Sequence, residues 1–149
     1  FHAKYGGGKA APITGAVSLK DIPGLAPGKY AVFAHQSGEV RVIGTGGKWP
    51  IQLKRNQWEI FTFTAVNNGH AILGLADKFN SGGAVTSLRH GKKQTSFRLR
   101  DAGILVMYSA EKPSSIRLEN KPLAMQYNKK TGKVTVTVPA QGSLTVLWE

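Results

Sequence analysis

The sequence predicts an all-β fold, an antiparallel β-sandwich of the Greek-key type. Strand-sized stretches rich in β-branched and aromatic residues recur along the 149 residues, and turn residues separate them. No stretch of ten or more residues combines helical apolar spacing with capping residues, so any helix is short. The chain has no internal repeat of fixed period, which argues against a propeller or a solenoid.

The expected strands follow one another from residue 29 to the end of the chain. Ser37-Gly38 is expected to turn the first hairpin, Gly46-Gly47 marks a second turn, and Asn68-Gly69 predicts a further hairpin because both residues tolerate positive φ. Valines alternate with threonines from Val134 to Val138, which places the valines on one face of a sheet. The expected strands cover residues 29–34, 39–43, 58–66, 71–73, 84–88, 96–100, 104–109, 115–118, 134–138 and 144–148.

Residues 1–12 are expected to form a flexible N-terminal arm or linker remnant, and residues 13–149 a single sandwich domain. The arm contains Gly6-Gly7-Gly8 and little patterned apolar sequence. A chain of this length buries roughly 70% of its unfolded surface on folding, so one ordinary core is sufficient. Because the sequence has no cysteine, packing rather than disulfides or zinc-thiolate sites must stabilise the fold.

The charge balance points to an attraction for anions. Twenty Lys and Arg against eight Asp and Glu give a formal net charge of +12. Acidic or sulfated polysaccharide, nucleic acid and an anionic surface are all compatible with this charge. No apolar run approaches the ~20 residues that span a bilayer, and no signal segment is visible, so we expect a soluble chain without membrane insertion. The sequence indicates no compartment, and it leaves a homo-oligomer open.

No catalytic residue, metal site or cofactor is expected. The Gly-Lys pairs lack the following Ser or Thr of a phosphate-binding P-loop. The four histidines, His2, His35, His70 and His90, have no spacing that would bring two onto one metal. The acidic residues form no motif for glycoside hydrolysis, and there is no Gly-x-Ser-x-Gly elbow.

Trp49 is the aromatic candidate for ligand binding. It lies in Gly46-Gly47-Lys48-Trp49-Pro50, a turn setting, whereas Trp58 and Trp148 lie in strand patterns that predict core positions. An exposed indole beside hydrogen-bonding groups can stack on the face of a sugar. We therefore expect Trp49 to stack on a pyranose ring while Lys48, His35 and Gln36 supply hydrogen bonds.

The densest basic tract is the candidate polyanion site. It consists of Arg89, Lys92 and Lys93, followed by Arg98 and Arg100, whose spacing places the last two on one strand face. Such a face can contact phosphates or sulfates. The alternative is a solvated edge strand whose charges prevent sheet-to-sheet aggregation.

The order of several segments resembles the region that follows the catalytic barrel in plant raffinose synthases, a family that includes the seed imbibition proteins and alkaline α-galactosidases. The most specific piece is the tract Phe79-Asn80-Ser81-Gly82-Gly83-Ala84 within residues 78–85. The other matching segments are residues 13–22, 30–42, 50–54, 58–62, 106–113 and 144–148. The high basic content and Trp49, where the family has a smaller apolar residue, depart from the pattern.

The resemblance implies the C-terminal antiparallel β-sandwich of such an enzyme, without the barrel that carries the catalytic aspartates. It implies no catalytic residue in this chain. The expected function is that of a non-catalytic, lectin-like protein that binds a carbohydrate, either a neutral galactoside or an acidic or sulfated glycan. Two alternatives stay open: a detached structural domain or subunit of the enzyme, and a polyanion binder, for which nucleic acid is the less favoured ligand.

Overall fold

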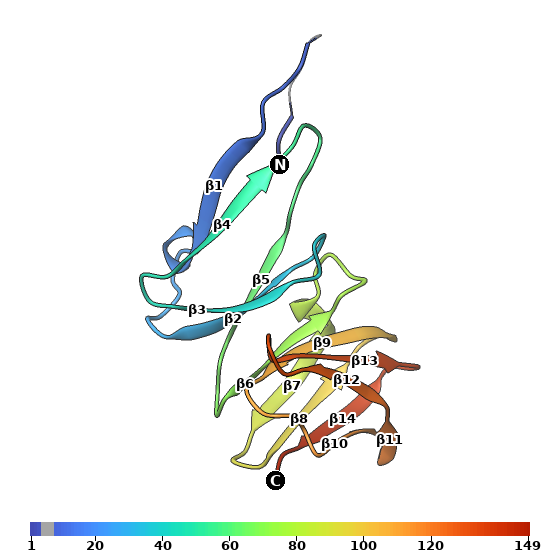
Figure 1. Cartoon of the computed structure of the whole chain (residues 1–149). Coiled ribbons are helices and arrows are strands. Elements are labelled where there is room, and N and C mark those ends of the chain that lie inside the picture. The colour runs from blue at the N-terminus through green and yellow to red at the C-terminus, as the bar shows by residue number, and fades with distance from the viewer. Residues whose placement is uncertain (4–7) are drawn as a thin grey trace.

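The structure, a computed structural model, describes residues 1–3 and 8–149 and consists almost entirely of β-strands (Figure 1). Two single 3₁₀ turns, η1 (Leu19–Asp21) and η2 (Gly82–Ala84), interrupt the strands. The strands are β1 (Ile13–Ser18), β2 (Lys29–Ala34), β3 (Val40–Gly44), β4 (Lys48–Leu53), β5 (Phe61–Ala65), β6 (His70–Leu75), β7 (Val85–His90), β8 (Gln94–Leu99), β9 (Gly103–Ser109), β10 (Ser115–Leu118), β11 (Lys121–Leu123), β12 (Met125–Asn128), β13 (Lys133–Val138) and β14 (Gly142–Leu147).

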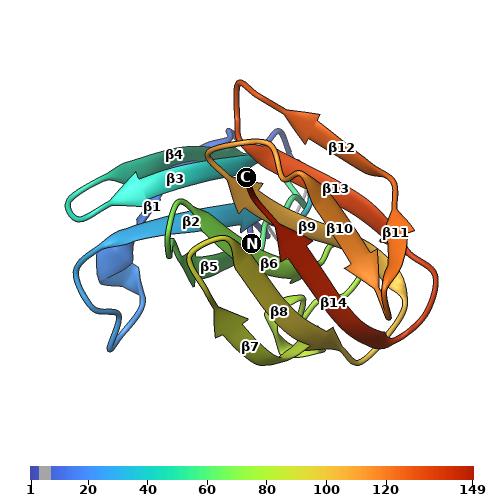
Figure 2. The same cartoon turned by 90° about the horizontal axis from the view of Figure 1, so that it is seen from below.

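These strands form four antiparallel sheets. Their orders are β11-β10-β14-β8-β7, β12-β13-β9-β6, β3-β2-β5 and β1-β4. The first two sheets pack face to face as a sandwich, and Figure 2 views the molecule from the side of the five-stranded sheet. The three-stranded sheet covers the other face of the four-stranded one, and the β1-β4 ribbon projects beyond it (Figure 1). The expected all-β antiparallel sandwich is confirmed.

Strand β9 shows how the apolar sequence builds these layers. Successive side chains of a strand point to opposite faces of its sheet. Leu105 and Met107 pack into the sandwich core, whereas Val106 and Tyr108 pack toward the three-stranded sheet. Because both faces of β9 are covered, its sequence is an almost unbroken apolar run rather than an alternating one.

Four strands are absent from the sequence prediction, and each of them lies at the edge of a sheet. They are β1, β4, β11 and β12. An edge strand needs little apolar alternation and tolerates proline, because one side of its backbone is unpaired. Pro50 in β4 and Pro122 in β11 occupy such positions, opposite Ala16 and Arg117.

The turn predicted at Asn68-Gly69 is present, but the hairpin prediction is wrong. Both residues have positive φ, 49° and 82°, as a tight turn of this kind requires. Only an isolated bridge between Asn67 and His70 closes the turn, and β5 and β6 belong to different sheets. The turn therefore connects two layers instead of two paired strands.

The N-terminal segment contacts the rest of the chain at His2. Its amide donates to the Gln57 carbonyl at 2.9 Å, and its carbonyl accepts from the Asn56 amide at 2.8 Å. Strand β1 begins at Ile13, the residue at which the sequence places the domain boundary. Gly6 and Gly7, which support the prediction of a flexible arm, lie outside the described residues, so that arm stays a prediction.

Within the described ranges, no helix has the length and apolar character needed to cross a membrane.

Candidate functional site

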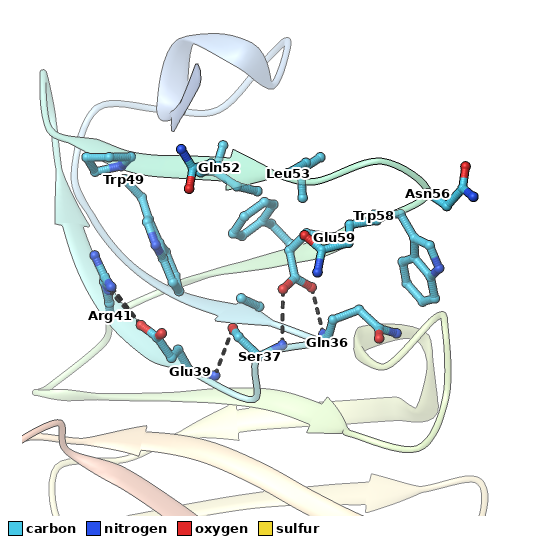
Figure 3. Close-up of a pocket in the computed structure, with 15 residues that line it drawn as sticks. Gln36, Ser37, Glu39, Arg41, Trp49, Gln52, Leu53, Asn56, Trp58 and Glu59 are labelled. Atoms are coloured by element: carbon cyan, nitrogen blue, oxygen red, sulfur yellow. Dashed lines mark hydrogen bonds and ion pairs between the residues drawn. The ribbon is translucent and has the colours of Figure 1, made fainter. Parts of the chain in front are cut away.

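An open groove of about 520 Å³ runs along β4, beside the β2-β3 hairpin and the segment that joins β4 to β5 (Figure 3). Trp49 stands at one end of the groove and Trp58 at the other, with Glu59 between them. Polar side chains make up much of the remaining lining. Those with hydrogen-bonding groups are Gln36, Ser37, Glu39, Arg41, Gln52, Asn56, Gln57 and Glu59.

The prediction that Trp49 is an exposed turn residue is wrong. Trp49 lies in β4 opposite Val17, and only 5% of its surface is exposed. Its ring packs edge-on against Phe61 with 5.2 Å between centroids, and the Arg41 Cζ atom lies 4.5 Å from its centroid. The turn at Gly46-Gly47 ends where β4 begins, at Lys48, so Trp49 lies within the strand rather than in the turn. Trp49 is therefore a core residue that contributes one wall of the groove and whose ring Arg41 covers.

The other members of the predicted sugar site are only partly brought together. Gln36 lines the groove, and His35 lines a neighbouring hollow of about 220 Å³. Lys48 is exposed on β4 opposite Ser18, at the strand end away from Leu53. Of the four predicted residues, only Trp49 and Gln36 thus line the same groove.

The structure places Trp58 differently from the core position that its sequence pattern predicts. It is half-buried in the segment between β4 and β5, outside any strand, and it lines both the groove and the neighbouring hollow. Phe79, 76% exposed, lies beside it with 5.9 Å between ring centroids. Two aromatic rings from distant parts of the chain therefore form an accessible apolar ridge at the end of a polar groove.

The tract around Phe79 has a structural explanation for its unusual composition. Ser81 is 1% exposed, and its hydroxyl donates to the Leu73 carbonyl at 2.7 Å. Gly74, with φ of 102°, lets the Ser81 backbone approach so closely that any Cβ at residue 74 would clash with it. The Asn80 side-chain oxygen accepts the Gly83 amide at 3.1 Å. These contacts fix the turn and leave the Phe79 ring outside it.

Glu59 holds the shape of the groove. Its Oε1 accepts the amides of Gln36 at 2.7 Å and Ile60 at 3.0 Å, and its Oε2 accepts the Ser37 amide at 3.1 Å. Hydrogen bonds between backbone amides and a carboxylate are among the strong ones. The Glu59 carboxylate therefore holds the turn between β2 and β3 against the segment that leads into β5.

Glu39, the other acidic residue of the groove, is paired with Arg41. The Arg41 Nη2 and Glu39 Oε2 atoms are 2.7 Å apart, and both side chains are about half exposed, at 49% and 51%. Because the same guanidinium also lies over Trp49, Arg41 contacts both Glu39 and the indole. Both carboxylates of the groove thus already accept hydrogen bonds from the protein.

His35 lies beside the groove and contacts side chains of β2 and β5. Its Nε2 lies 3.0 Å from the Thr62 hydroxyl, and its ring lies 4.6 Å from that of Phe33. Burial lowers the pKa of His35 below the usual value for histidine, although the nearby Glu59 charge opposes the shift. The shift favours the neutral ring, and its interaction with Thr62 positions the ring rather than leaving both nitrogens free for a ligand.

The predicted basic tract lies on the five-stranded sheet, away from the groove (Figure 1). Arg89 belongs to β7, Arg98 to β8, and Arg100 follows the end of β8. Lys92 and Lys93 lie in the turn between the two strands. All five side chains are exposed, so the structure places the tract at the surface as one hairpin.

His70 and Trp148 form a further aromatic contact, in the sandwich. Their rings stack with 3.8 Å between centroids, and the Trp148 indole donates to the Ser109 hydroxyl at 2.8 Å. Trp148 is half-buried and packs against the sandwich core, so the core position that its strand pattern predicts is confirmed in part. In the part of the chain that the structure describes, no three His, Cys, Asp or Glu side chains gather as a metal site would require.

Sequence comparison identifies what the chain is similar to. The family model described as raffinose synthase or seed imbibition protein Sip1 matches residues 14–138. A probable galactinol–sucrose galactosyltransferase 1 of Arabidopsis thaliana is 30% identical over 132 residues, which are 82% of this chain and 18% of that protein. A second Arabidopsis relative, probable galactinol–sucrose galactosyltransferase 6, is 27% identical over 85% of this chain and 19% of its own length. The stachyose synthase of Pisum sativum is 26% identical over 74% of this chain and 14% of its own length. The chain thus spans less than a fifth of the length of these relatives.

Proposed function

This chain belongs to the raffinose synthase and seed imbibition protein family, and we propose that it is a non-catalytic domain whose groove binds a neutral oligosaccharide. The observation that carries the proposal is the ridge of Trp58 and Phe79 at the end of the groove. A sugar ring presents an apolar face and hydroxyl edges, and an exposed aromatic beside polar groups matches both. Trp58 takes the stacking role that the sequence assigns to Trp49.

The polar lining supports a ligand with many hydroxyl groups. The amides of Gln36, Gln52 and Asn56 each donate and accept hydrogen bonds, as sugar hydroxyls do. A neutral ligand fits better than an anion, because Glu39 and Glu59 offset the charge of Arg41 in the groove. The names of the relatives refer to galactinol, sucrose and stachyose, which makes neutral galactosyl oligosaccharides the first ligands to test.

The state of the two groove carboxylates favours binding over catalysis. Glycoside chemistry needs one carboxyl group to transfer a proton and another to act as base or nucleophile. Glu59 already accepts three backbone amides, and Glu39 pairs with Arg41. Their positions are explained by the architecture of the turn, which supports a site that recognises a sugar without transforming it.

The second candidate is a purely structural domain of a larger enzyme. The relatives are five to seven times as long as the portion that they share with this chain, since that portion is 18%, 19% and 14% of their lengths. In this alternative the groove has no ligand. Binding measurements separate the two candidates directly.

The test is isothermal titration of the chain with sucrose, galactinol, raffinose and stachyose, each at low and high salt. We expect at least one ligand to bind, with little salt dependence because the contacts are neutral. Phe79→Ala and Trp58→Ala should weaken that binding about tenfold or more, as the loss of an aromatic stacking contact does.

Ile104→Ala is the control, because Ile104 is also an exposed apolar side chain, at 46%, but lies on β9 outside the groove. It should leave affinity unchanged. Failure of all four sugars to bind would contradict the proposal and favour the structural domain. An equal loss in the control variant would instead reject the assignment of the site.

A further inference from the structure

The outer face of the five-stranded sheet has a composition of its own. The inward side chains of its strands fill the sandwich core, among them Phe97 and Leu99 of β8 and Leu144 and Val146 of β14. The residues between them therefore point outward. On β7, β8, β10 and β14 this face carries Thr86, Arg89, Gln94, Ser96, Arg98, Ser115, Arg117, Ser143, Thr145 and Leu147.

Strand register aligns four of these residues in one row across the sheet. Arg89 of β7 is opposite Ser96 of β8, Ser96 is opposite Thr145 of β14, and Thr145 is opposite Arg117 of β10. Directly opposed residues project to the same face. Three spacings of about 4.8 Å give a row roughly 14 Å long. Two hydroxyls thus lie between two guanidinium groups, and Arg98 stands in the next row.

A β-bulge gives Arg89 its place in this row. The register shifts between Thr86 and Arg89, so that three steps along β7 match two steps along β8. Ser87, inside the bulge, has a φ of 53°, a conformation that non-glycine residues seldom adopt. Without the extra residue, Leu88 would lie opposite Ser96 and Arg89 would point inward. The bulge therefore re-aims a charged side chain onto the open face.

This charge is uncompensated within the sheet. None of the strands β7, β8, β10, β11 and β14 contains Asp or Glu. The two salt bridges among the described residues join Arg41 to Glu39 and Lys78 to Asp101. Arg89, Arg98 and Arg117 are all exposed and take part in neither. Guanidinium groups in this state are suited to bidentate contact with an external carboxylate or sulfate.

We infer that the row Arg89-Ser96-Thr145-Arg117, with Arg98 beside it, is a binding face for an anionic polysaccharide, separate from the groove. The hydroxyls between the arginines match the sugar hydroxyls between the acidic groups of such a polymer. No Phe, Tyr or Trp is present on this face of the described sheet, although single-stranded nucleic acid is bound largely by stacking on aromatic rings. Charge and hydroxyls without a stacking platform favour the polysaccharide.

The experiment compares the chain with the triple variant R89Q/R98Q/R117Q and with the control variant K20Q/K54Q/K129Q, which loses the same charge from three exposed lysines elsewhere. The probes are heparin, polygalacturonate, neutral dextran and a single-stranded oligonucleotide, in binding titrations at increasing salt. Thermal unfolding confirms that each variant is folded.

We expect heparin or polygalacturonate to bind, with an affinity that falls as salt rises. The arginine variant should lose about tenfold or more of this affinity, and the lysine variant less than about threefold. The heparin and polygalacturonate arms tell sulfate from carboxylate recognition. Equal losses in the two variants, tighter binding of the oligonucleotide, or no binding of either acidic polymer would overturn the inference.

Discussion

The guanidinium of Arg41 lies over the indole of Trp49, with 4.5 Å between the Arg41 Cζ atom and the ring centroid. This contact determines which of the two groove tryptophans a ligand can reach. A sugar could stack on that face of Trp49 only by displacing Arg41 from the ring. The ring at the opposite end of the groove, Trp58, has Phe79 beside it, and no cation lies over it in the part of the chain that the structure describes.

The two tryptophans should therefore differ in what their removal costs. Trp49→Ala should lower the free energy of unfolding by about 3 to 5 kcal/mol, because it leaves a large cavity in the core. Trp58→Ala should lower it by less than about 1.5 kcal/mol, since the ring is half-buried in a loop. Urea unfolding of both variants measures the difference. Similar losses in the two would contradict the separation into a core indole and a binding indole.

Glu59→Gln should loosen the groove without unfolding the chain. A glutamine side chain offers one acceptor oxygen in place of two, so at least one amide among Gln36, Ser37 and Ile60 loses its partner. We expect stability to fall by about 1 to 3 kcal/mol, and the amide of Ser37 to exchange faster with solvent.

Glu39→Gln is the control for that measurement, because Glu39 forms an exposed ion pair with Arg41. Its effect on stability should stay within about 1 kcal/mol. If Ser37 exchange were equally fast in both variants, Glu59 would not be the group that fixes the turn.

Acid should destabilise the fold through His70. Its Nδ1 lies 3.0 Å from the Asn68 carbonyl, which can only accept, so Nδ1 carries the proton and Nε2 accepts from the Thr95 hydroxyl at 2.8 Å. Burial and the neighbouring His90 lower the pKa of His70, and the bond to Asn68 opposes them. The folded state therefore binds this proton less readily than the unfolded chain does.

The sign of the effect follows from linkage. The unfolded pKa is about 6.5, so the full stability is present above that pH and declines as the pH falls toward the lower folded pKa of His70. Chemical unfolding between pH 7.5 and pH 5 should show this decline. His35 shifts in the same direction, so His70→Gln should remove part of the decline and H35Q/H70Q most of it. A decline unaffected in the double variant would place its origin elsewhere.

Local chemistry accounts for the parts of the fold that could be predicted. The residues of β2 and β10 form strands with the expected bounds, because their apolar and β-branched composition is decided within each segment. The place of Trp49 could not be predicted, since it depends on pairing with β1 more than thirty residues away. Glycines and a proline beside Trp49 are equally compatible with a turn and with an edge strand.

The functional surfaces depend even more on tertiary pairing. Phe79 has the sequence feature on which the prediction for Trp49 rests, an aromatic residue among glycine and polar residues. Only the fold places Phe79 beside Trp58. Arg117 is distant in sequence from Arg89 and joins it only because β10, β14, β8 and β7 are neighbours in that order. The basic tract predicted from the sequence therefore contains Lys92 and Lys93 but not Arg117.

The most direct test of the sugar-binding proposal is a titration followed through the indole N–H signals of the three tryptophans by NMR. Trp49 lies under Arg41, Trp148 donates to Ser109, and Trp58 lines the groove. With galactinol or raffinose at millimolar concentration, the account predicts that the Trp58 signal shifts while the Trp148 signal stays in place. A shift confined to Trp49 or Trp148, or no shift at all, would contradict it.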